Sequence, residues 1–322
     1  MVLTAFQTTF AAIVKLVFLG FVGFALVKRS IIHEEGLKTL NDLVIGLFLP
    51  LFMFSEITQR FSFGLYADWW LFPLYSFVIT AAGFGIGSFV LKAVKSLEPH
   101  RGEFLGITSF QNSGYLPLPL VAALLPEPLA REMFIFIFLF LLGFNMTIFS
   151  FGVMLLSGKK KPGEFEARHI FNAPVVATLL ALACVFFGLN NYLPRVLTEP
   201  MELLGRCAVP LSILVVGGNL ASIKTNNISD FRPLGYALAI KLFILPLFFL
   251  GLLILMRPAP LVGLLILLQA AMPPAAMLSV IAKNKDSSDC LINQSIFYGH
   301  ILSILTIPLF LVLYWLLAGK SF

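Results

Sequence analysis

Apolar segments long enough to cross a lipid bilayer follow one another along almost the whole chain. Crossing a hydrocarbon core of ~30 Å takes roughly 20 consecutive apolar residues in a helix. Irregular backbone cannot face lipid, because its polar groups would lack partners there. With 59% hydrophobic and 12% charged residues, the chain cannot form the surface of a water-soluble domain. We therefore expect an all-α polytopic membrane protein with about ten spans, at 4–27, 38–57, 69–94, 104–125, 129–157, 170–189, 199–221, 233–256, 259–282 and 291–318.

Lysine and arginine are concentrated in alternate connections between these spans. The connections after the odd-numbered spans hold most of them, and the other side holds only Arg60, Arg131, Arg195, Arg257 and Lys320. Basic loops stay on the cytoplasmic side, so both termini are expected on the non-cytoplasmic side, in a cell inner (plasma) membrane. This bias accounts for most of the net charge of +6, and no nucleic-acid partner is expected.

A basic segment, 158–169, divides the chain into two halves, 1–157 and 170–322, with five expected spans each. An odd number of spans per half means that related halves would lie inverted in the membrane. Spans four and nine both contain helix-breaking residues near their middle. Span four reads Asn112-Ser-Gly-Tyr-Leu-Pro117-Leu-Pro119, and span nine reads Gln269-Ala-Ala-Met-Pro273-Pro274.

Proline lacks a backbone N–H and clashes with the preceding helical turn, so both spans are expected to be interrupted. Interrupted spans at matching places in two halves indicate a transporter site, because the N-terminal ends of half-helices offer N–H donors to an anion. A kink without function is the alternative for either proline segment taken alone. The matched pair favours a site for a small organic anion such as a carboxylate.

At these residues the sequence resembles the auxin efflux carrier family. The motifs that carry the resemblance are Asn112 to Leu120 in span four and Gln269 to Pro273 in span nine, and shorter similarities touch most of the chain. The resemblance implies a ten-helix, five-plus-five inverted repeat like that of sodium/proton antiporters and bile-acid symporters, with helices four and nine broken and crossing. It also implies an elevator-type carrier, commonly a homodimer, with helices 1, 2, 6 and 7 as the scaffold domain and helices 3–5 and 8–10 as the transport domain.

The resemblance also implies roles for single residues. Asn112 matches a substrate-contacting asparagine and Gln269 a glutamine of the ninth helix, while Asp68 matches an acidic residue that plant members pair with a lysine. No lysine follows Asp68 by one turn here, so that supporting ion pair and auxin itself as substrate are not assumed. The residues expected at the substrate site are Asn112, Ser113, Gly114, Tyr115, Gln269, Pro273 and Pro274, and those at the crossing are Pro117, Pro119, Pro273 and Pro274.

Charged and polar residues inside the spans need partners, because an unpaired charge in a membrane is costly. Lys15 and Lys241 are expected to extend to the interface or to pair with an acid on another span. Arg206 is expected to pair with Glu202, four residues earlier on the same helical face. His300 is either a hydrogen-bonded core residue or the carrier of a coupling proton.

Glycines 83, 85 and 87 in span three lie within lipid depth, and close helix packing is favoured over a phosphate loop.

No cofactor, metal site or enzyme activity is expected, because the three cysteines lack ligand spacing and no catalytic signature is present. The expected partners are an organic anion substrate, the bilayer and a second copy of the chain. Two other functions stay open: a sodium-coupled symporter of the bile-acid type, and an ion channel. A channel is less favoured, because no selectivity loop or ring of like charges is present.

Overall fold

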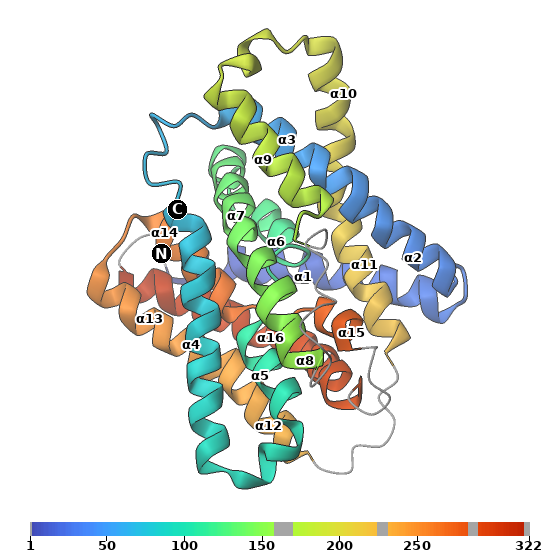
Figure 1. The fold of residues 1–322 in the computed structure, drawn as a ribbon, viewed down its shortest axis with the longest axis vertical. Helices are drawn as coiled ribbons and strands as arrows, with labels where there is room; N and C mark the ends of the chain where they lie inside the picture. The colour runs from blue at the N-terminus through green and yellow to red at the C-terminus, as the bar shows by residue number, and fades with distance from the viewer. Residues whose placement is uncertain (1, 158–169, 224–230, 283–288, 319–322) are drawn as a thin grey trace.

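The computed structural model is built from helices throughout the residues that it describes, 2–157, 170–223, 231–282 and 289–318 (Figure 1). The basic segment 158–169 and several of the cytoplasmic lysines that set the expected orientation lie outside these residues. The helices of the first half are α1 (Val2–Lys28), α2 (Glu34–Leu43), η1 (Val44–Phe48), α3 (Leu49–Arg60), α4 (Leu71–Ala93), η2 (Lys95–His100), α5 (Arg101–Ser109), α6 (Pro117–Leu124), α7 (Glu127–Thr147), η3 (Ile148–Gly152) and α8 (Val153–Ser157). Those of the second half are α9 (Ala173–Phe186), η5 (Leu189–Tyr192), α10 (Arg195–Arg206), α11 (Ala208–Ser222), α12 (Arg232–Ala239), η6 (Ile240–Ile244), α13 (Leu245–Met256), α14 (Pro260–Ala271), α15 (Met277–Ala282) and α16 (Asp289–Ala318).

Several neighbouring elements join into single long helices. Within the described residues, seven helices are long and apolar enough to cross a membrane, and α9 and α14 are shorter apolar helices. The seven are Thr9–Lys28, Glu34–Arg60, Leu71–Ala93, Glu127–Leu156, Arg195–Ser222, Arg232–Met256 and Leu291–Leu317. A polytopic helical membrane protein is thus confirmed, whereas the count of ten membrane spans and the inverted relation of the two halves stay predictions.

Two of the long helices contain a widened π-helical turn directly before a proline. η1 ends two residues before Pro50, and η6 ends two residues before Pro246. Proline cannot donate to the preceding turn and its ring crowds that turn, so a wider turn lets the helix continue. The helices bend here without ending, in contrast to the two interrupted segments described below.

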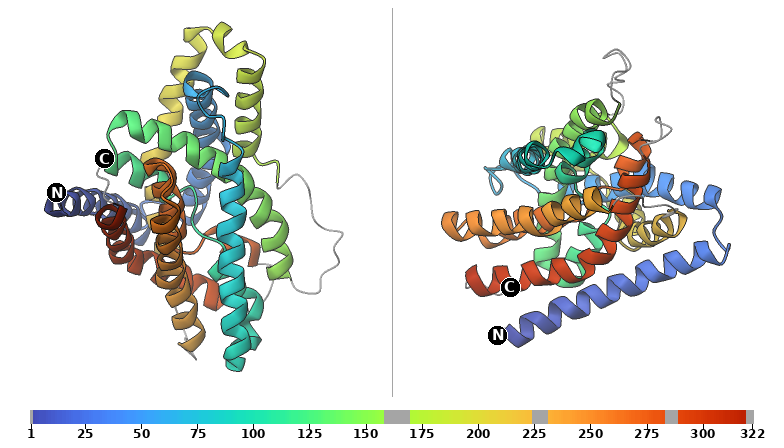
Figure 2. Two further views of the ribbon diagram at one scale, coloured as in Figure 1. Left: turned by 90° about the vertical axis from the view of Figure 1, so that its left-hand side faces the viewer. Right: turned by 90° about the horizontal axis from the view of Figure 1, so that it is seen from below.

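Glycines allow the closest helix contacts. A Cβ atom on Gly217 of α11 would collide with the carbonyl oxygen of Gly20 of α1, and one on Gly83 of α4 would collide with that of Thr108 of α5. Gly87 also faces Thr108, whereas a Cβ on Gly85 would meet no atom within 4 Å. Close packing through Gly83 and Gly87 is therefore confirmed. Figure 2 shows α1 running along one edge of the molecule, beside α16.

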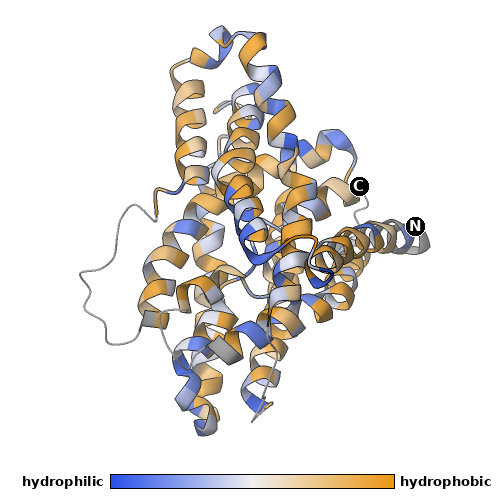
Figure 3. Ribbon diagram, turned by 90° about the vertical axis from the view of Figure 1, so that its right-hand side faces the viewer, coloured by the Kyte–Doolittle hydropathy of each residue, from blue (hydrophilic) through white to orange (hydrophobic). Residues whose placement is uncertain are grey.

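The core centres on α7, where nearly every residue from Met133 to Phe144 is buried. Aromatic rings of α7 pack on those of neighbouring helices, such as Phe138 on Phe52 of α3 and Phe136 on Phe72 of α4. Large apolar side chains are also exposed on many helices, and hydrophobic residues dominate the ribbon in Figure 3, as expected for a protein whose outer surface meets lipid. α7 also packs on α6 and α14, which flank the interrupted segments described below.

Candidate functional site: the crossing of two interrupted helices

Two helical segments are interrupted in the interior of the protein. The chain leaves helical geometry after Ser109 at the end of α5 and resumes it at Pro117. A second interruption separates Ala271, the last residue of α14, from Met277 of α15. Asparagine, serine, glycine and proline all disfavour a continued helix, and both interruptions contain such residues. The predicted interruption of both segments is confirmed.

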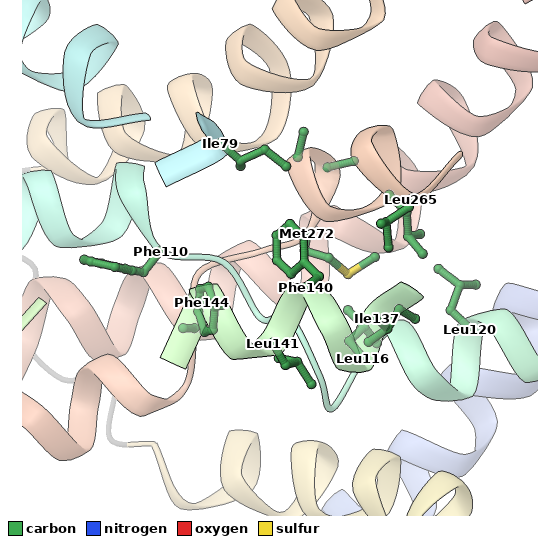
Figure 4. Packing of buried hydrophobic residues seen from close by; sticks show 14 of the residues in the cluster. Ile79, Phe110, Leu116, Leu120, Ile137, Phe140, Leu141, Phe144, Leu265 and Met272 are labelled. Atoms are coloured by element: carbon green, nitrogen blue, oxygen red, sulfur yellow. The ribbon is translucent and has the colours of Figure 1, made fainter. Parts of the chain in front are cut away.

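The two interruptions pair with each other through a single antiparallel bridge. Gln111 and Pro274 form an isolated β-bridge. The backbone N–H of Asn112 donates to the carbonyl of Pro273 (2.8 Å), and the N–H of Ala275 donates to that of Phe110 (3.1 Å). Each broken helix thereby satisfies backbone groups that the other leaves free. Figure 4 shows this region enclosed by apolar side chains, among them Phe110, Met272 and Phe140.

His300 of α16 holds the side chain of Asn112. The Nδ2 atom of Asn112 lies 3.1 Å from Nε2 of His300, and Nδ1 of the ring lies 2.7 Å from the carbonyl oxygen of Ile296. A carbonyl can only accept and an amide nitrogen can only donate, so Nδ1 carries the proton and Nε2 accepts. The Oδ1 atom of Asn112 accepts from the N–H of Leu116 (3.4 Å). This network fixes the Asn112 amide in one orientation, in which His300 is neutral.

Backbone donors are left over where α6 and α15 begin. In the described part of the chain, the N–H groups of Gly114 and Tyr115, before α6, have no hydrogen-bond partner. The same holds for the N–H groups of Ala276, directly before α15, and of Met277, its first residue. All four residues are half-buried. Unpaired N–H groups at the positive end of a helix attract anions, so these donors suit a carboxylate.

Gln269 and Tyr115 tie the first interruption to its surroundings. The Nε2 atom of Gln269, at the end of α14, donates to the carbonyl of Ser113 (3.1 Å). Its Oε1 atom is buried and has no partner in the described residues. The hydroxyl of Tyr115 donates to Oδ1 of Asn41 on α2 (2.8 Å). The segment that carries the free donors is therefore fixed on both sides.

Lys241, in the π-helical turn η6, is completely buried. Its Nζ atom lies 3.3 Å from Oε1 of Gln111 and 3.4 Å from the carbonyl oxygen of Thr108, in the last turn of α5. The expectation that Lys241 extends to the interface or pairs with an acid was wrong. Its partners are neutral oxygens of the first interrupted segment, one of them a backbone group that sequence patterns do not reveal.

A cavity of about 320 Å³ lies between α1, α6, α11 and α16. Its walls are almost entirely apolar, and His300 and Ser303 are the polar residues among those that line it. His300 thus stands between the cavity on one side and Asn112 on the other. An organic molecule with an apolar body fits the chemistry of these walls.

Three Glu–Arg pairs with a spacing of four residues meet in one ionic cluster, and the first of them joins Glu56 to Arg60 (3.2 Å). The predicted pair of Glu202 with Arg206 is confirmed at 2.7 Å. Arg131 of α7 contacts Glu127 (2.6 Å), the buried Glu56 of α3 (3.2 Å) and Glu202 of α10 (3.4 Å). The cluster was not predicted, although the repeated Glu-x-x-x-Arg spacing was a usable signal. It joins the helices α3, α7 and α10.

The structure separates some residues that were expected together. Pro273 and Pro274 lie in the pairing itself, together with Asn112, whereas Pro117 and Pro119 lie in the first turn of α6. Asp68 is exposed in the turn before α4, where its carbonyl accepts a hydrogen bond from the N–H of Leu71. Among the described residues, no group of three or more His, Cys, Asp and Glu side chains is arranged to hold a metal ion.

Comparison with known proteins identifies the chain. The model of a family described as membrane transport protein matches residues 8–311. The chain belongs to this family of PIN-like auxin efflux carriers. It is 24% identical to the protein PIN-LIKES 1 of Arabidopsis thaliana, over 98% of this chain and 81% of that protein. It is also 26% identical to an uncharacterized transporter of Methanothermobacter thermautotrophicus, over 95% of this chain and 99% of the relative.

Archaeal members of the family extend the comparison. An uncharacterized transporter of Methanocaldococcus jannaschii is 26% identical over 87% of this chain and 90% of that protein. Together with the apolar helices, membership establishes an integral membrane protein of a transporter family. The resemblance drawn from the two proline-containing motifs is confirmed.

Proposed function

We propose that the protein is a secondary active transporter of small organic anions, with its substrate site at the crossing of α5–α6 and α14–α15. The observation that carries the proposal is the pair of unpartnered N–H groups of Gly114 and Tyr115, next to the buried amide of Asn112. Such donors in a place of low dielectric stabilise a negative group strongly. Glu56, the one carboxylate among the buried residues that the structure describes, lies in the ionic cluster and leaves this position free for a substrate carboxylate.

The neighbouring cavity supports a substrate with an apolar body. A substrate whose carboxylate binds near Asn112 would extend its apolar part past His300 into the cavity. There it would contact lining residues such as Leu120 and Val216. Burying apolar surface there is favourable by roughly 25 cal/mol per Å². We therefore propose a monocarboxylate with an aliphatic or aromatic group ahead of a dicarboxylate.

The grouping of helices supports an elevator-type cycle in a five-plus-five inverted repeat. α1 packs mainly on α11, and α3 packs mainly on α9 and α10. These contacts are between helices of the proposed scaffold domain. α4 packs mainly on α5 and α7, within the proposed transport domain. The cavity lies between the groups, since α1 and α11 form one wall and α6 and α16 the other. A homodimer remains a prediction from the resemblance.

The sodium-coupled alternative has less support. A sodium ion needs several oxygen ligands, commonly carbonyls at the C-terminal end of a half-helix. At the end of α5 that place is taken by the ammonium group of Lys241, which contacts the carbonyl of Thr108. His300 remains our proposed carrier of a coupling proton, and Asp68, exposed before α4, a proposed supporting residue.

The test is uptake of radiolabelled carboxylates into proteoliposomes that contain the purified protein. A carrier saturates and shows trans-stimulation, whereas a channel does neither. We expect Asn112→Ala and Pro273→Ala each to reduce uptake sharply, because the first removes a polar contact and the second lets a helix continue through the break.

Asn191→Ala, at an exposed asparagine, and Pro308→Ala, within α16, are the matched controls and should transport normally. Normal uptake by both test variants would refute the site.

A further inference from the structure

Lys241 is a buried lysine without an anionic partner. None of its side chain is exposed, and no carboxylate of the described residues lies within ion-pair distance of it. An isolated charge is costly to bury, so the groups around Lys241 decide whether an ammonium group can be held there.

The surroundings of Lys241 are those of a cation site. The last turn of a helix carries partial negative charge on carbonyl groups that lack intrahelical partners. α5 ends at Ser109 inside the protein, and Nζ of Lys241 reaches the Thr108 carbonyl and Oε1 of Gln111 there. Gly83 brings α4 onto the same carbonyl of Thr108, which excludes water from that side. In carriers with broken helices, the backbone carbonyls at the C-terminal ends of half-helices take part in binding Na⁺ or H⁺.

We infer that Lys241 is a built-in cation, whose ammonium group occupies the place at the end of α5 where a cation-coupled carrier would bind a metal ion. The inference rests on the proposed transport function. It explains how the partial negative charge at the end of α5 is neutralised at the crossing without a bound metal ion. It also makes Lys241 a positioning residue, because its contact with Gln111 holds the strand that continues into Asn112.

The inference has a consequence for ion dependence. Transport by the natural protein should not require sodium, because the cation is already attached to the chain. Shortening the side chain in Lys241→Ala leaves the oxygens of Thr108 and Gln111 facing an empty space. A small cation from solution can then take the place of the lost ammonium group.

The experiment measures uptake in chloride salts of N-methyl-D-glucamine, sodium and methylammonium at equal ionic strength. Lys15→Ala, at an exposed lysine of α1, is the matched control. We expect the natural protein and Lys15→Ala to transport equally in all three salts. Uptake by Lys241→Ala should fall about tenfold in N-methyl-D-glucamine chloride, because a buried contact of a charged group is lost. Its uptake should recover in sodium or methylammonium chloride.

A second measurement needs no transport. Thermal unfolding of the purified protein in the same salts reports cation binding directly, since a ligand that binds only the folded state raises the midpoint. The midpoint of Lys241→Ala should rise in sodium or methylammonium relative to N-methyl-D-glucamine, while that of the natural protein should not. If the natural protein transports no carboxylate, the proposed function fails, and this measurement still decides the role of Lys241.

The inference is overturned if the natural protein needs sodium for uptake. It is also overturned if Lys241→Ala behaves identically in all three salts, whether active or inactive. Should Lys241→Ala fail to fold, Lys241→Met decides, because it keeps the side-chain volume and removes the charge. Full uptake by Lys241→Met would show that the charge is dispensable, whereas a folded variant with uptake reduced about tenfold supports the inference.

Discussion

The side-chain amide of Asn112 donates a hydrogen bond to Nε2 of His300 over 3.1 Å. A proton added to Nε2 would turn this acceptor into a donor and break the contact, because two donors would face each other. The Asn112 amide would then have to rotate, and its Oδ1 would leave the N–H of Leu116. The orientation of a residue at the proposed site is thus linked to the protonation of His300.

His300→Gln tests this link. Glutamine can accept a hydrogen bond from the Asn112 amide but cannot take up a proton. Uptake should therefore lose its dependence on a pH gradient, while substrate binding stays measurable. Uptake at several internal and external pH values, with a thermal-shift measurement of binding, checks both parts. Unchanged pH dependence would remove His300 from the coupling mechanism.

Arg131→Gln should destabilise the protein by about 1–3 kcal/mol, because the buried carboxylate of Glu56 loses one of its two arginines and keeps only the partly exposed Arg60. The matched control is Arg101→Gln, which breaks an ion pair with Glu98 that is about half exposed on both sides and should cost less than about 1 kcal/mol. Thermal unfolding in detergent compares the two variants. Equal shifts in the midpoint would contradict a structural role for the cluster.

Gly83→Ala and Gly85→Ala should behave oppositely, although the two glycines are neighbours on α4. A Cβ at Gly83 collides with the backbone of α5, and such overpacking typically costs about 1–3 kcal/mol. A Cβ at Gly85 meets nothing, and alanine is favoured over glycine in a helix by roughly 0.5–1 kcal/mol. The unfolding midpoints should therefore move in opposite directions, and a fall of similar size in both would be inconsistent with the observed packing.

Val216→Phe should alter selectivity for substrate size. The larger side chain fills part of the cavity of about 320 Å³, and Asn112 is not among the residues that line this cavity. Uptake of large aromatic carboxylates should fall several-fold, with little change for the smallest ones. Competition assays with a series of carboxylates measure this, and Val176→Phe, at an exposed position of α9, is the control. A uniform loss across the series would place the substrate outside the cavity.

Local patterns in the sequence predict the interruptions well, because asparagine, glycine and proline act on their own turn of helix. They do not predict how the interruptions meet. The first break begins before Asn112, and the prolines that signal it, Pro117 and Pro119, serve to start α6. Pairing of Gln111 with Pro274 depends on the packing of the whole molecule, which a single sequence without aligned relatives does not reveal.

The partners of the buried charges were harder to predict for the same reason. Glu202 and Arg206 share a helical face, so their pair follows from spacing alone. Glu56 meets Arg131 only because α3 packs against α7. Lys241 binds a backbone carbonyl that is free only because α5 stops inside the protein. Helix positions could be predicted from the sequence, whereas contacts between distant helices required the structure.

The antiparallel pairing of the two interruptions also constrains how the protein is made. During synthesis, the backbone groups of Phe110 and Asn112 enter the membrane long before residues 273–275 exist to accept or donate to them. Until the residues between α14 and α15 have been inserted, these groups must form hydrogen bonds with water, lipid headgroups or the insertion machinery. Assembly of the crossing is therefore a late event, and a chain shortened before residue 273 cannot complete even the part of the site that lies in its first half.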